Sequence, residues 1–175
     1  MRRVAKFEKV SLEQFKKDWL EAFEYYEFDE GNYEDIYNSI KLPTRATSGS
    51  AGYDFFMPVG WKMFAKENTC LKIPTGIRVK IEDGWVLKCY PKSGLGFKYK
   101  LQLLNTVGII DSDYYKSDNE GHIFAKLYND NNERKELVFK QGDGFMQGVF
   151  VEYGITYDDD VDGIRNGGLG STAKN

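Results

Sequence analysis

Short alternating runs of residues, which begin near residue 39 and continue through most of the chain, constrain the fold more than any other feature. Within these runs apolar and polar side chains alternate with a period of two, which is typical of strands that bury one face. Gly, Pro and Asn separate the runs, and Asp83-Gly84 predicts a tight turn between two of them. Many short strands joined by turns predict an all-β fold, a jelly-roll-like barrel or sandwich. The clearest runs span residues 77–81, 85–90, 122–128 and 137–139.

Residues 1–38 differ in kind and predict an N-terminal helical extension. Ser11 and Gln14 have the spacing of a capping box, and Val10 and Phe15 are placed for a hydrophobic staple, so we expect a helix to begin here. Apolar side chains then recur at helical spacing, and this stripe must be covered by the β domain or by a neighbouring subunit. The stripe comprises Leu12, Phe15, Trp19, Ala22, Phe23 and Tyr26.

The same extension is acidic, with six basic and ten acidic residues and hence a net charge of -4. Acids and tyrosines are dense between residues 24 and 35. Two interpretations are open. The extension is a helical cap packed on the rest of the chain, or its acidic helical segment binds a protein partner.

Length and charge bound the remaining possibilities. A chain of 175 residues fits one domain that can bury a core without a disulfide or a metal. A formal net charge of -3 argues against a general nucleic-acid binder. Cys70 and Cys89 lack metal-ligand spacing, and the chain has neither the apolar core of a signal peptide nor an apolar run long enough for a membrane span. We therefore expect a cytoplasmic protein that binds neither nucleic acid stably nor membranes.

The run from Pro91 to Tyr114 carries the chemistry. Small and hydroxylated residues at Ser93, Gly94 and Gly96 let backbone N–H groups approach phosphate oxygens, and Lys92 adds a cation beside them. Further on, residues 107–110 predict a buried strand of a β-hairpin that ends at a carboxylate, Asp111. The pattern predicts a phosphate-binding turn about twenty residues from an isolated carboxylate.

This stretch resembles the second and third motifs of the trimeric deoxyuridine triphosphatases, the dUTPases, and the other three motifs of that family follow in the expected order. They are residues 51–55 for the first, 141–143 with Gln147 for the fourth, and 165–172 for the fifth. The resemblance implies the all-β jelly-roll of that family, assembled as a homotrimer with shared active sites. It divides the chain into the extension (1–38), a β domain (39–160) and a flexible glycine-rich arm (161–175) that closes over the active site.

The resemblance also implies an activity, the Mg²⁺-dependent hydrolysis of dUTP to dUMP and pyrophosphate. Water would attack the α-phosphate with Asp111 as general base, because the family places its catalytic aspartate at this motif position. Asp113 is interpreted as structural. Such an enzyme limits the incorporation of uracil into DNA and supplies dUMP for dTMP synthesis.

Substrate contacts are implied in the same way. Asn105, Gly108 and Ile110 would line the uracil pocket, and Tyr114 would lie beneath the deoxyribose and leave no room for a 2′-hydroxyl. The Mg²⁺ would be held mainly by the phosphates of the substrate, with Asp54 reaching it through water. The phosphates and the closing arm would involve Lys92, Ser93, Gly94, Gln147, Arg165, Leu169, Gly170, Ser171 and Thr172.

Three positions depart from the usual pattern. Lys92 replaces a common Arg, which turns a bidentate fork into a point charge. Gly144 stands where a basic residue is common, and Leu169 stands where a phenylalanine usually stacks on the uracil. We expect weaker closure over the substrate rather than lost activity. Residues 115–120 are an insertion, and His122, the only histidine, is interpreted as structural.

Two other functions compete with hydrolysis of dUTP. A related dCTP deaminase would need a glutamate in the strand after the hairpin, but residues 121–127 contain no acid. The second is a nucleotide-sensing regulatory protein that binds the nucleotide as a switch and contacts a regulator through the extension.

Overall fold

The computed structural model describes residues 1–24, 33–65, 70–163 and 165–166. Strands dominate these ranges, as the alternating pattern predicts, and no helix among them is long and apolar enough to cross a membrane. The helical elements are α1 (Leu12–Ala22), α2 (Tyr33–Ser39), α3 (Ser93–Tyr99) and the 3₁₀ helix η2 (Ser112–Lys116). The strands are β1 (Ala5–Lys9), β2 (Thr44–Arg45), β3 (Tyr53–Phe56), β4 (Trp61–Met63), β5 (Leu71–Pro74), β6 (Ile77–Ile81), β7 (Trp85–Pro91), β8 (Leu101–Leu103), β9 (Gly108–Ile110), β10 (Phe124–Asn129), β11 (Leu137–Phe139) and β12 (Gly144–Glu152).

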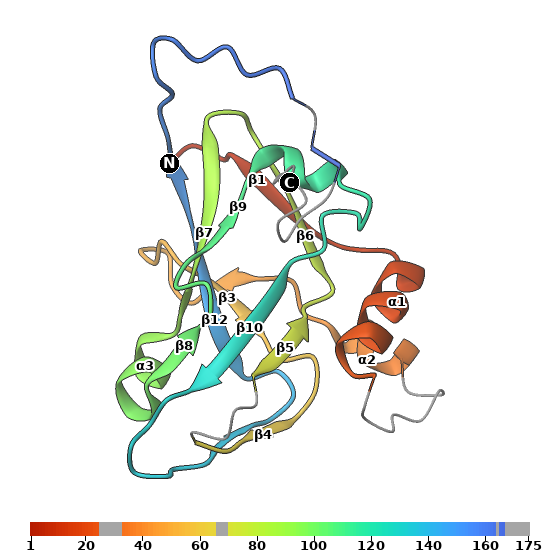
Figure 1. Ribbon diagram of the computed structural model, residues 1–175, viewed down its shortest axis with the longest axis vertical. Coiled ribbons are helices and arrows are strands. Elements are labelled where there is room, and N and C mark those ends of the chain that lie inside the picture. The colour runs from red at the N-terminus through yellow and green to blue at the C-terminus, as the bar shows by residue number, and fades with distance from the viewer. Residues whose placement is uncertain (25–32, 66–69, 164, 167–175) are drawn as a thin grey trace.

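The described strands form four antiparallel sheets, and the largest has the order β2-β3-β12-β7-β9 (Figure 1). The others pair β5-β10-β8, β11-β4 and β1-β6. In this order, strands distant in sequence become neighbours, since β12 lies between β3 and β7. The long central ladder of β12 and β7 brings the ends of several motif segments to the same sheet. The predicted all-β fold is confirmed.

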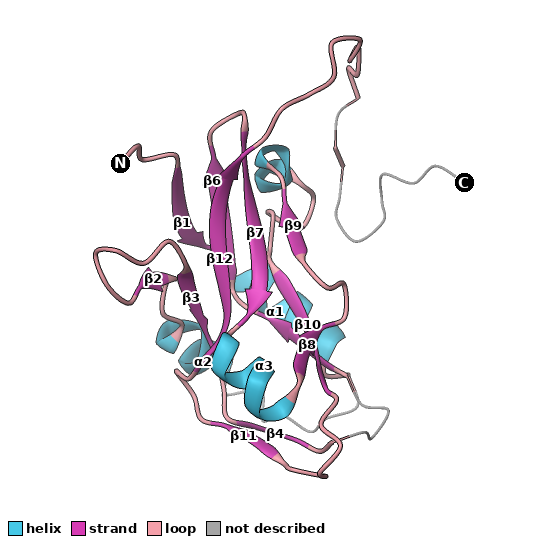
Figure 2. Cartoon of the chain, turned by 90° about the vertical axis from the view of Figure 1, so that its left-hand side faces the viewer, coloured by secondary structure: helices cyan, strands magenta, loops and turns pink. Residues whose placement is uncertain are grey.

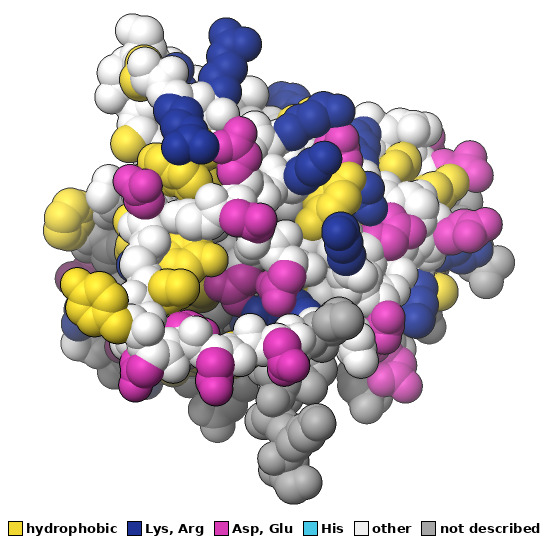
Figure 3. All heavy atoms as spheres, turned by 90° about the horizontal axis from the view of Figure 1, so that it is seen from above, with side chains coloured by type: hydrophobic (Ala, Val, Ile, Leu, Met, Phe, Trp, Pro, Cys, Tyr) yellow, Lys and Arg dark blue, Asp and Glu magenta, His cyan; other side chains and the backbone are white. Residues whose placement is uncertain are grey.

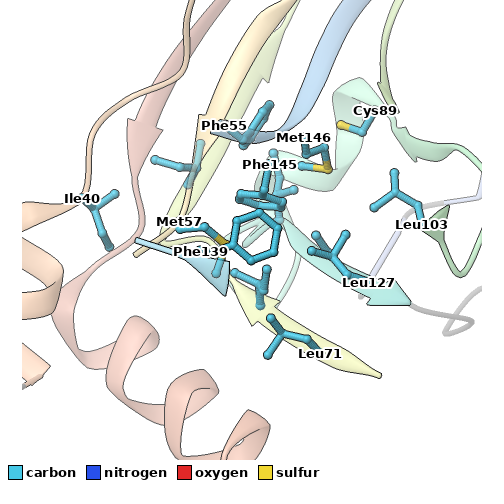
Figure 4. Packing of buried hydrophobic residues seen from close by; sticks show 14 of the residues in the cluster. Ile40, Phe55, Met57, Leu71, Cys89, Leu103, Leu127, Phe139, Phe145 and Met146 are labelled. Carbon is cyan, nitrogen blue, oxygen red and sulfur yellow. The ribbon is translucent and has the colours of Figure 1, made fainter. Parts of the chain in front are cut away.

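The core lies between these sheets, and alternation along each strand fills it. In β6, for example, Ile77, Val79 and Ile81 are buried while Lys80 is exposed. Figure 4 shows the centre of the cluster, where aromatic and sulfur-containing side chains of β3, β11 and β12 meet leucines of β5, β8 and β10. Because side chains from strands distant in sequence interlock there, burial of this cluster stabilises the whole topology.

The cap of α1 confirms half of the predicted capping box. The Ser11 hydroxyl accepts a hydrogen bond from the Gln14 backbone N–H at 3.1 Å. The reciprocal bond is absent, because the Gln14 side chain donates to Asp18 at 2.9 Å instead. The Ser11 backbone N–H donates to Glu120 at 2.8 Å. A carboxylate from another part of the chain therefore completes the cap.

The apolar stripe of α1 packs within its own chain. Phe15 and Trp19 are fully buried and Phe23 is nearly so, and the helix lies against β5 and α2 on one side of the sheets (Figures 1 and 2). The interpretation of this helix as a packed cap is confirmed for its described part. Tyr26 and the acidic run 25–32 lie outside the described residues.

A strand within the extension is an addition to the sequence-based picture. β1 pairs antiparallel with β6 over its whole length, from Ala5 opposite Ile81 to Lys9 opposite Ile77. Phe7 contacts Tyr53, Phe55 and Phe150 across the sheet interface, with ring centroids 5.3 to 5.7 Å apart. The extension is therefore part of the β architecture as well as a helical cap.

A buried polar pair joins α1 to the β domain. His122 is fully buried, and its Nε2 accepts a hydrogen bond from the Gly76 backbone N–H at 2.7 Å, so its Nδ1 carries the hydrogen that faces Asp18 at 2.5 Å. Burial raises the pKa of Asp18, but the hydrogen bonds from His122 and Gln14 outweigh it and lower that pKa below its ordinary value. This geometry supports the structural interpretation of His122.

We predict that Asp18→Ala lowers the free energy of unfolding by about 2–3 kcal/mol at neutral pH, because the buried His122 N–H loses its acceptor. The lowered pKa means that this stabilisation is present above the ordinary carboxyl pKa and is lost as pH falls through the folded value. Urea unfolding of wild type and of Asp18→Ala should show a difference in the free energy of unfolding that becomes smaller as the pH is lowered. Asp118→Ala, which removes an exposed carboxylate, is the matched control. Equal stability of Asp18→Ala and wild type at pH 7 would contradict the prediction.

Candidate active site

The second motif forms the start of a helix, where the sequence predicted a turn. β7 ends at Pro91, Lys92 occupies the N-cap, and α3 begins at Ser93. The first amides of a helix have no partner within it, so the N–H groups of Ser93 and Gly94 are available to an anion. The role of Ser93 and Gly94 as phosphate ligands remains a prediction. Their free N–H groups lie at the start of a helix and not in a turn.

Lys92 is held by the first motif. Its Nζ lies 2.7 Å from Asp54 Oδ2, an ion pair between the end of β7 and the middle of β3. The lysine side chain passes over Gly144, where an added Cβ would lie only 3.1 Å from Nζ and 3.2 Å from Cδ. The missing side chain at position 144 therefore makes room for Lys92, and two departures from the family pattern fit each other.

Gln147 of the fourth motif joins the same cluster. It pairs with Asp54 on β3 and with Tyr90 on β7. Its Oε1 would lie 2.8 Å from a Cβ at position 52, so Gly52 of the first motif gives this side chain its space. The structure thus brings the first, second and fourth motifs together at one end of the five-stranded sheet, and we name Asp54, Lys92, Gly144 and Gln147 the phosphate-end cluster.

The third motif does not form the predicted paired hairpin. β8 pairs with β10, whereas β9 pairs with β7, with Cys89 opposite Gly108 and Leu87 opposite Ile110. The connection carries the exposed Asn105, and the strand after it is only half-buried, since Ile109 is 51% exposed. The prediction of a buried strand was wrong because β9 lies at the edge of its sheet.

Steric crowding explains why position 108 of this strand is a glycine. A Cβ at position 108 would lie 3.1 Å from the Cys89 Cβ and 3.8 Å from the Asn105 side-chain nitrogen. The backbone of β9 therefore approaches β7 closely, and the edge of β9 that faces away from β7 keeps its N–H and C=O groups accessible. Backbone groups of this kind can pair with the edge of a base.

Tyr114 is almost fully buried beside the end of β9. Its hydroxyl donates to the His122 carbonyl at 2.7 Å and accepts from the Asn119 side chain at 2.8 Å. Burial is the main reason that its pKa is raised. The Arg165 guanidinium lies 5.9 Å from the centre of its ring. The ring is rigidly held, as a sugar platform would need to be.

Asp111 is a half-exposed carboxylate that shares one arginine with its neighbour. Arg165 Nη2 lies 2.5 Å from Asp111 Oδ2, and its Nε lies 2.8 Å from Asp113 Oδ1. Asp111 is 44% exposed, so water reaches it. Sequence reasoning missed the role of Asp113 as a partner of Arg165, although the spacing of two residues between the acids signals a shared cation. Leu169, Gly170, Ser171 and Thr172 lie outside the described residues.

Within one chain the two halves of the site lie apart. Ile110 pairs with Leu87, five residues before Lys92, which corresponds to about 17 Å along a strand. Asp111 continues away from α3, and Figure 1 shows α3 at one end of β7 with β9 leading toward the other. The carboxylate of one chain is therefore too far from the α3 amides of the same chain to act on a phosphate held there.

A cavity of about 760 Å³ lies elsewhere on the molecule. The N-terminal residues, Arg45 and Trp85 line it, and it reaches the first motif only at Ala51 and Tyr53. Neither Lys92 nor Asp111 belongs to it. The shape of the surface alone would therefore place a binding site away from Lys92 and Asp111. The end of the molecule that carries the 153–163 segment has acidic and basic side chains interspersed rather than a basic stripe (Figure 3).

Comparison with known proteins assigns the family. The dUTPase family model matches residues 38–172. The chain belongs to the dUTPase family. It is 40% identical over 136 residues to the deoxyuridine 5'-triphosphate nucleotidohydrolase of Lactococcus lactis, an alignment that covers 76% of this chain and 88% of the relative.

Solved dUTPases share the fold. The crystal structure of the Streptococcus mutans dUTPase has a TM-score of 0.60 and 28% identity, and the match covers 86% of this chain and 97% of that one. A dUTPase variant from phage phi11 of Staphylococcus aureus, whose structure is reported to reveal the coordination of a structural Mg(II) ion, has a TM-score of 0.54 and 19% identity over 71% of this chain and 92% of its own. The latter likeness concerns the fold alone.

Proposed function

We propose that the chain hydrolyses dUTP to dUMP and pyrophosphate. Membership of the dUTPase family supports this, and the observation that carries the chemistry is Asp111, a water-accessible carboxylate fixed at the end of β9. Such a carboxylate can hold a water molecule and accept its proton as the oxygen attacks the α-phosphate. In the enzyme with bound substrate, Arg165 exchanges its two carboxylates for phosphate oxygens, which frees Asp111 to act as a base.

The phosphate-end cluster binds the triphosphate. The free amides at the start of α3 hold the α-phosphate in line with the attacking water, and Lys92 supplies positive charge. The ion pair with Asp54 fixes the position of the Lys92 ammonium group. A lysine that is held in this way replaces part of the orientation that the planar guanidinium of an arginine would provide. Gln147 completes the cluster with an amide that donates to a phosphate oxygen.

The donor set at this cluster fits magnesium only as an ion carried by the substrate. Among the residues that the structure describes, no group of three or more His, Cys, Asp or Glu side chains is placed to hold a metal. Asp54 already binds Lys92 through one oxygen, so it can contribute at most its other oxygen, through water. Bound Mg²⁺ would neutralise the negative charge that grows on the departing pyrophosphate.

Selection of base and sugar belongs to the third motif. The free backbone edge of β9, with Gly108 and Ile110, and the Asn105 side chain would recognise the uracil edge. The buried ring of Tyr114 would lie under the deoxyribose, where an added 2′-hydroxyl would lose its hydrogen bonds to water without gaining others.

The active enzyme is a homotrimer whose sites combine segments of different subunits. The distance of about 17 Å between the β9 carboxylate end and Lys92 along β7 supports this, because one chain alone cannot apply both to one phosphate. A neighbouring copy can bring its α3 to this chain's Asp111. The arm that follows Arg165 would close over such a shared site.

The test is pyrophosphate release from dUTP with Mg²⁺, measured beside dTTP, dCTP and UTP. We expect release from dUTP at least about 10²-fold faster than from the others, and loss of release when EDTA removes the metal. Release of ammonia from dCTP would instead support the deaminase alternative. Binding of dUTP without turnover would support the nucleotide-sensing protein and contradict the hydrolase.

In the cell this activity would keep uracil out of DNA and supply dUMP for dTMP synthesis, in the cytoplasm where nucleotides are made. The family model that supports this role matches residues 38–172, so the role rests on those residues and not on the extension.

A further inference from the structure

The extension contacts the segment that follows Asp111, and the first contact is made by β1. The Tyr115 hydroxyl donates to Glu8 at 2.5 Å, and the Arg78 guanidinium lies over the Tyr115 ring, 4.1 Å from its centre, and also donates to its hydroxyl. Lys6 binds the other oxygen of Glu8 at 2.8 Å. Tyr115, one residue beyond the proposed sugar platform, is therefore held on its ring face and at its hydroxyl.

The second contact lies at the cap of α1. Glu120 accepts two hydrogen bonds from Ser11, one from the backbone N–H at 2.8 Å and one from the hydroxyl at 2.6 Å. Arg78 Nη1 lies 3.7 Å from the same carboxylate. Glu120 adopts a left-handed backbone conformation with φ at +58°, which is uncommon for a side chain of this kind. The two hydrogen bonds from Ser11 thus fix the C-terminal end of the insertion, residues 115–120.

The third contact is the buried bond between Asp18 and His122, whose carbonyl in turn accepts from the Tyr114 hydroxyl. The extension therefore holds the chain at three points: Tyr115 and Glu120, the two ends of the insertion, and His122 just after it. All three anchors come from residues 8–18, whereas the family model begins only at residue 38. The anchoring residues therefore lie outside the region that the family model matches.

We propose that the extension is a brace that positions the third motif, and that Glu8 and Ser11 are positioning residues for the reaction proposed above. They act through Tyr115 and Glu120, which keep the insertion from moving and so hold Tyr114 and Asp111 in place. Tyr115 follows Tyr114 directly, so displacement of one shifts the other.

Charge keeps this brace closed at neutral pH. The hydrogen bond from Lys6, followed by the one from Tyr115, lowers the pKa of Glu8 to about 2. Glu8 therefore stays ionised at neutral pH and remains an acceptor for the Tyr115 hydroxyl. Tyr115→Phe removes only the hydroxyl that Glu8 binds. The aromatic ring that packs against Arg78 remains.

The test compares Tyr115→Phe with wild type, with Tyr128→Phe in β10 as the matched control and Ser11→Ala as a second variant that weakens the other anchor. We expect a fall in kcat for dUTP of about tenfold with KM changed less than about threefold, because misplaced catalytic groups lower the rate more than the affinity. The preference for dUTP over UTP should fall by about fivefold, as the platform under the sugar shifts. Thermal unfolding should show all variants folded at the assay temperature.

A second readout needs no substrate. Amide hydrogen exchange of residues 112–121 should become at least about fivefold faster in Tyr115→Phe and Ser11→Ala, and remain unchanged in the control. This measurement separates the proposed hydrolysis from the proposed brace. An inactive wild type would overturn the hydrolysis, whereas amide hydrogen exchange would still test the brace. Unchanged exchange, or a variant that loses stability but keeps its kcat and its sugar preference, would overturn the positioning role.

Discussion

Asp111→Asn is expected to reduce kcat for dUTP by about 10³-fold while dUTP still binds, because an amide cannot take the proton of the attacking water. The substitution keeps the size and planarity of the side chain. Its oxygen can still accept from Arg165, which now lies 2.5 Å from Asp111 Oδ2. Single-turnover pyrophosphate release and dUTP binding by calorimetry would separate the chemical step from affinity.

The chain offers a close control for this substitution. Asp113 lies two residues further on and shares Arg165, with a distance of 2.8 Å to its Nε. If Asp113 is structural, Asp113→Asn should lower kcat by less than about tenfold, the size of effect that a changed arginine position would produce. Equal losses in the two variants would show that the pair acts through Arg165, and would remove Asp111 as a distinct base.

Mixing two inactive variants should restore activity if the sites are shared. Lys92→Ala removes the cation of the phosphate-end cluster, and Asp111→Asn removes the base about 17 Å or more away along β7 of the same chain. In a mixed trimer an intact Lys92 from one subunit can meet an intact Asp111 from another. Random association at equal amounts leaves about a quarter of all sites intact, since each site needs one intact half from each of two subunits. Trimers selected to contain both variants should show about a third of wild-type activity, because one of their three sites is intact.

The experiment requires coexpression with two affinity tags, so that only mixed assemblies are assayed. Two single variants purified separately and combined without subunit exchange are the control and should stay inactive. Mixed assemblies without activity, or a sedimentation coefficient of a monomer for active wild type, would exclude the shared site. In that case the arm and α3 would have to reach Asp111 within one chain.

The sequence predicted the strands well where alternation was local and one face was buried. The runs 77–81 and 137–139 coincide with β6 and β11, and the run 85–90 differs from β7 by one residue. Gly84 has a φ of +82°, as the Asp-Gly turn requires. The site residues of the first, second and fourth motifs also meet, since their spacing follows from neighbouring strands of one sheet.

Elements that depend on distant partners could not be predicted in this way. β1 carries only one strongly apolar side chain, Phe7, and becomes a strand because β6, about 70 residues later, offers its edge. α3 contains Gly94 and Gly96, which disfavour helices, and its position after β7 outweighs that propensity. The hairpin was expected from the apolar run 107–110 and from the resemblance to the family, whereas β8 and β9 pair with strands of two different sheets.

The pairing of β1 with β6 bears on how shorter forms of this protein would behave. In the described chain β6 has β1 as its sheet partner, so a protein that starts at the family boundary near residue 38 would expose a row of main-chain N–H and C=O groups beside the apolar Ile77, Val79 and Ile81. An uncovered edge of this kind recruits other chains into mixed sheets. We therefore expect the first nine residues to protect the molecule from edge-to-edge sheet aggregation, whatever they contribute to catalysis.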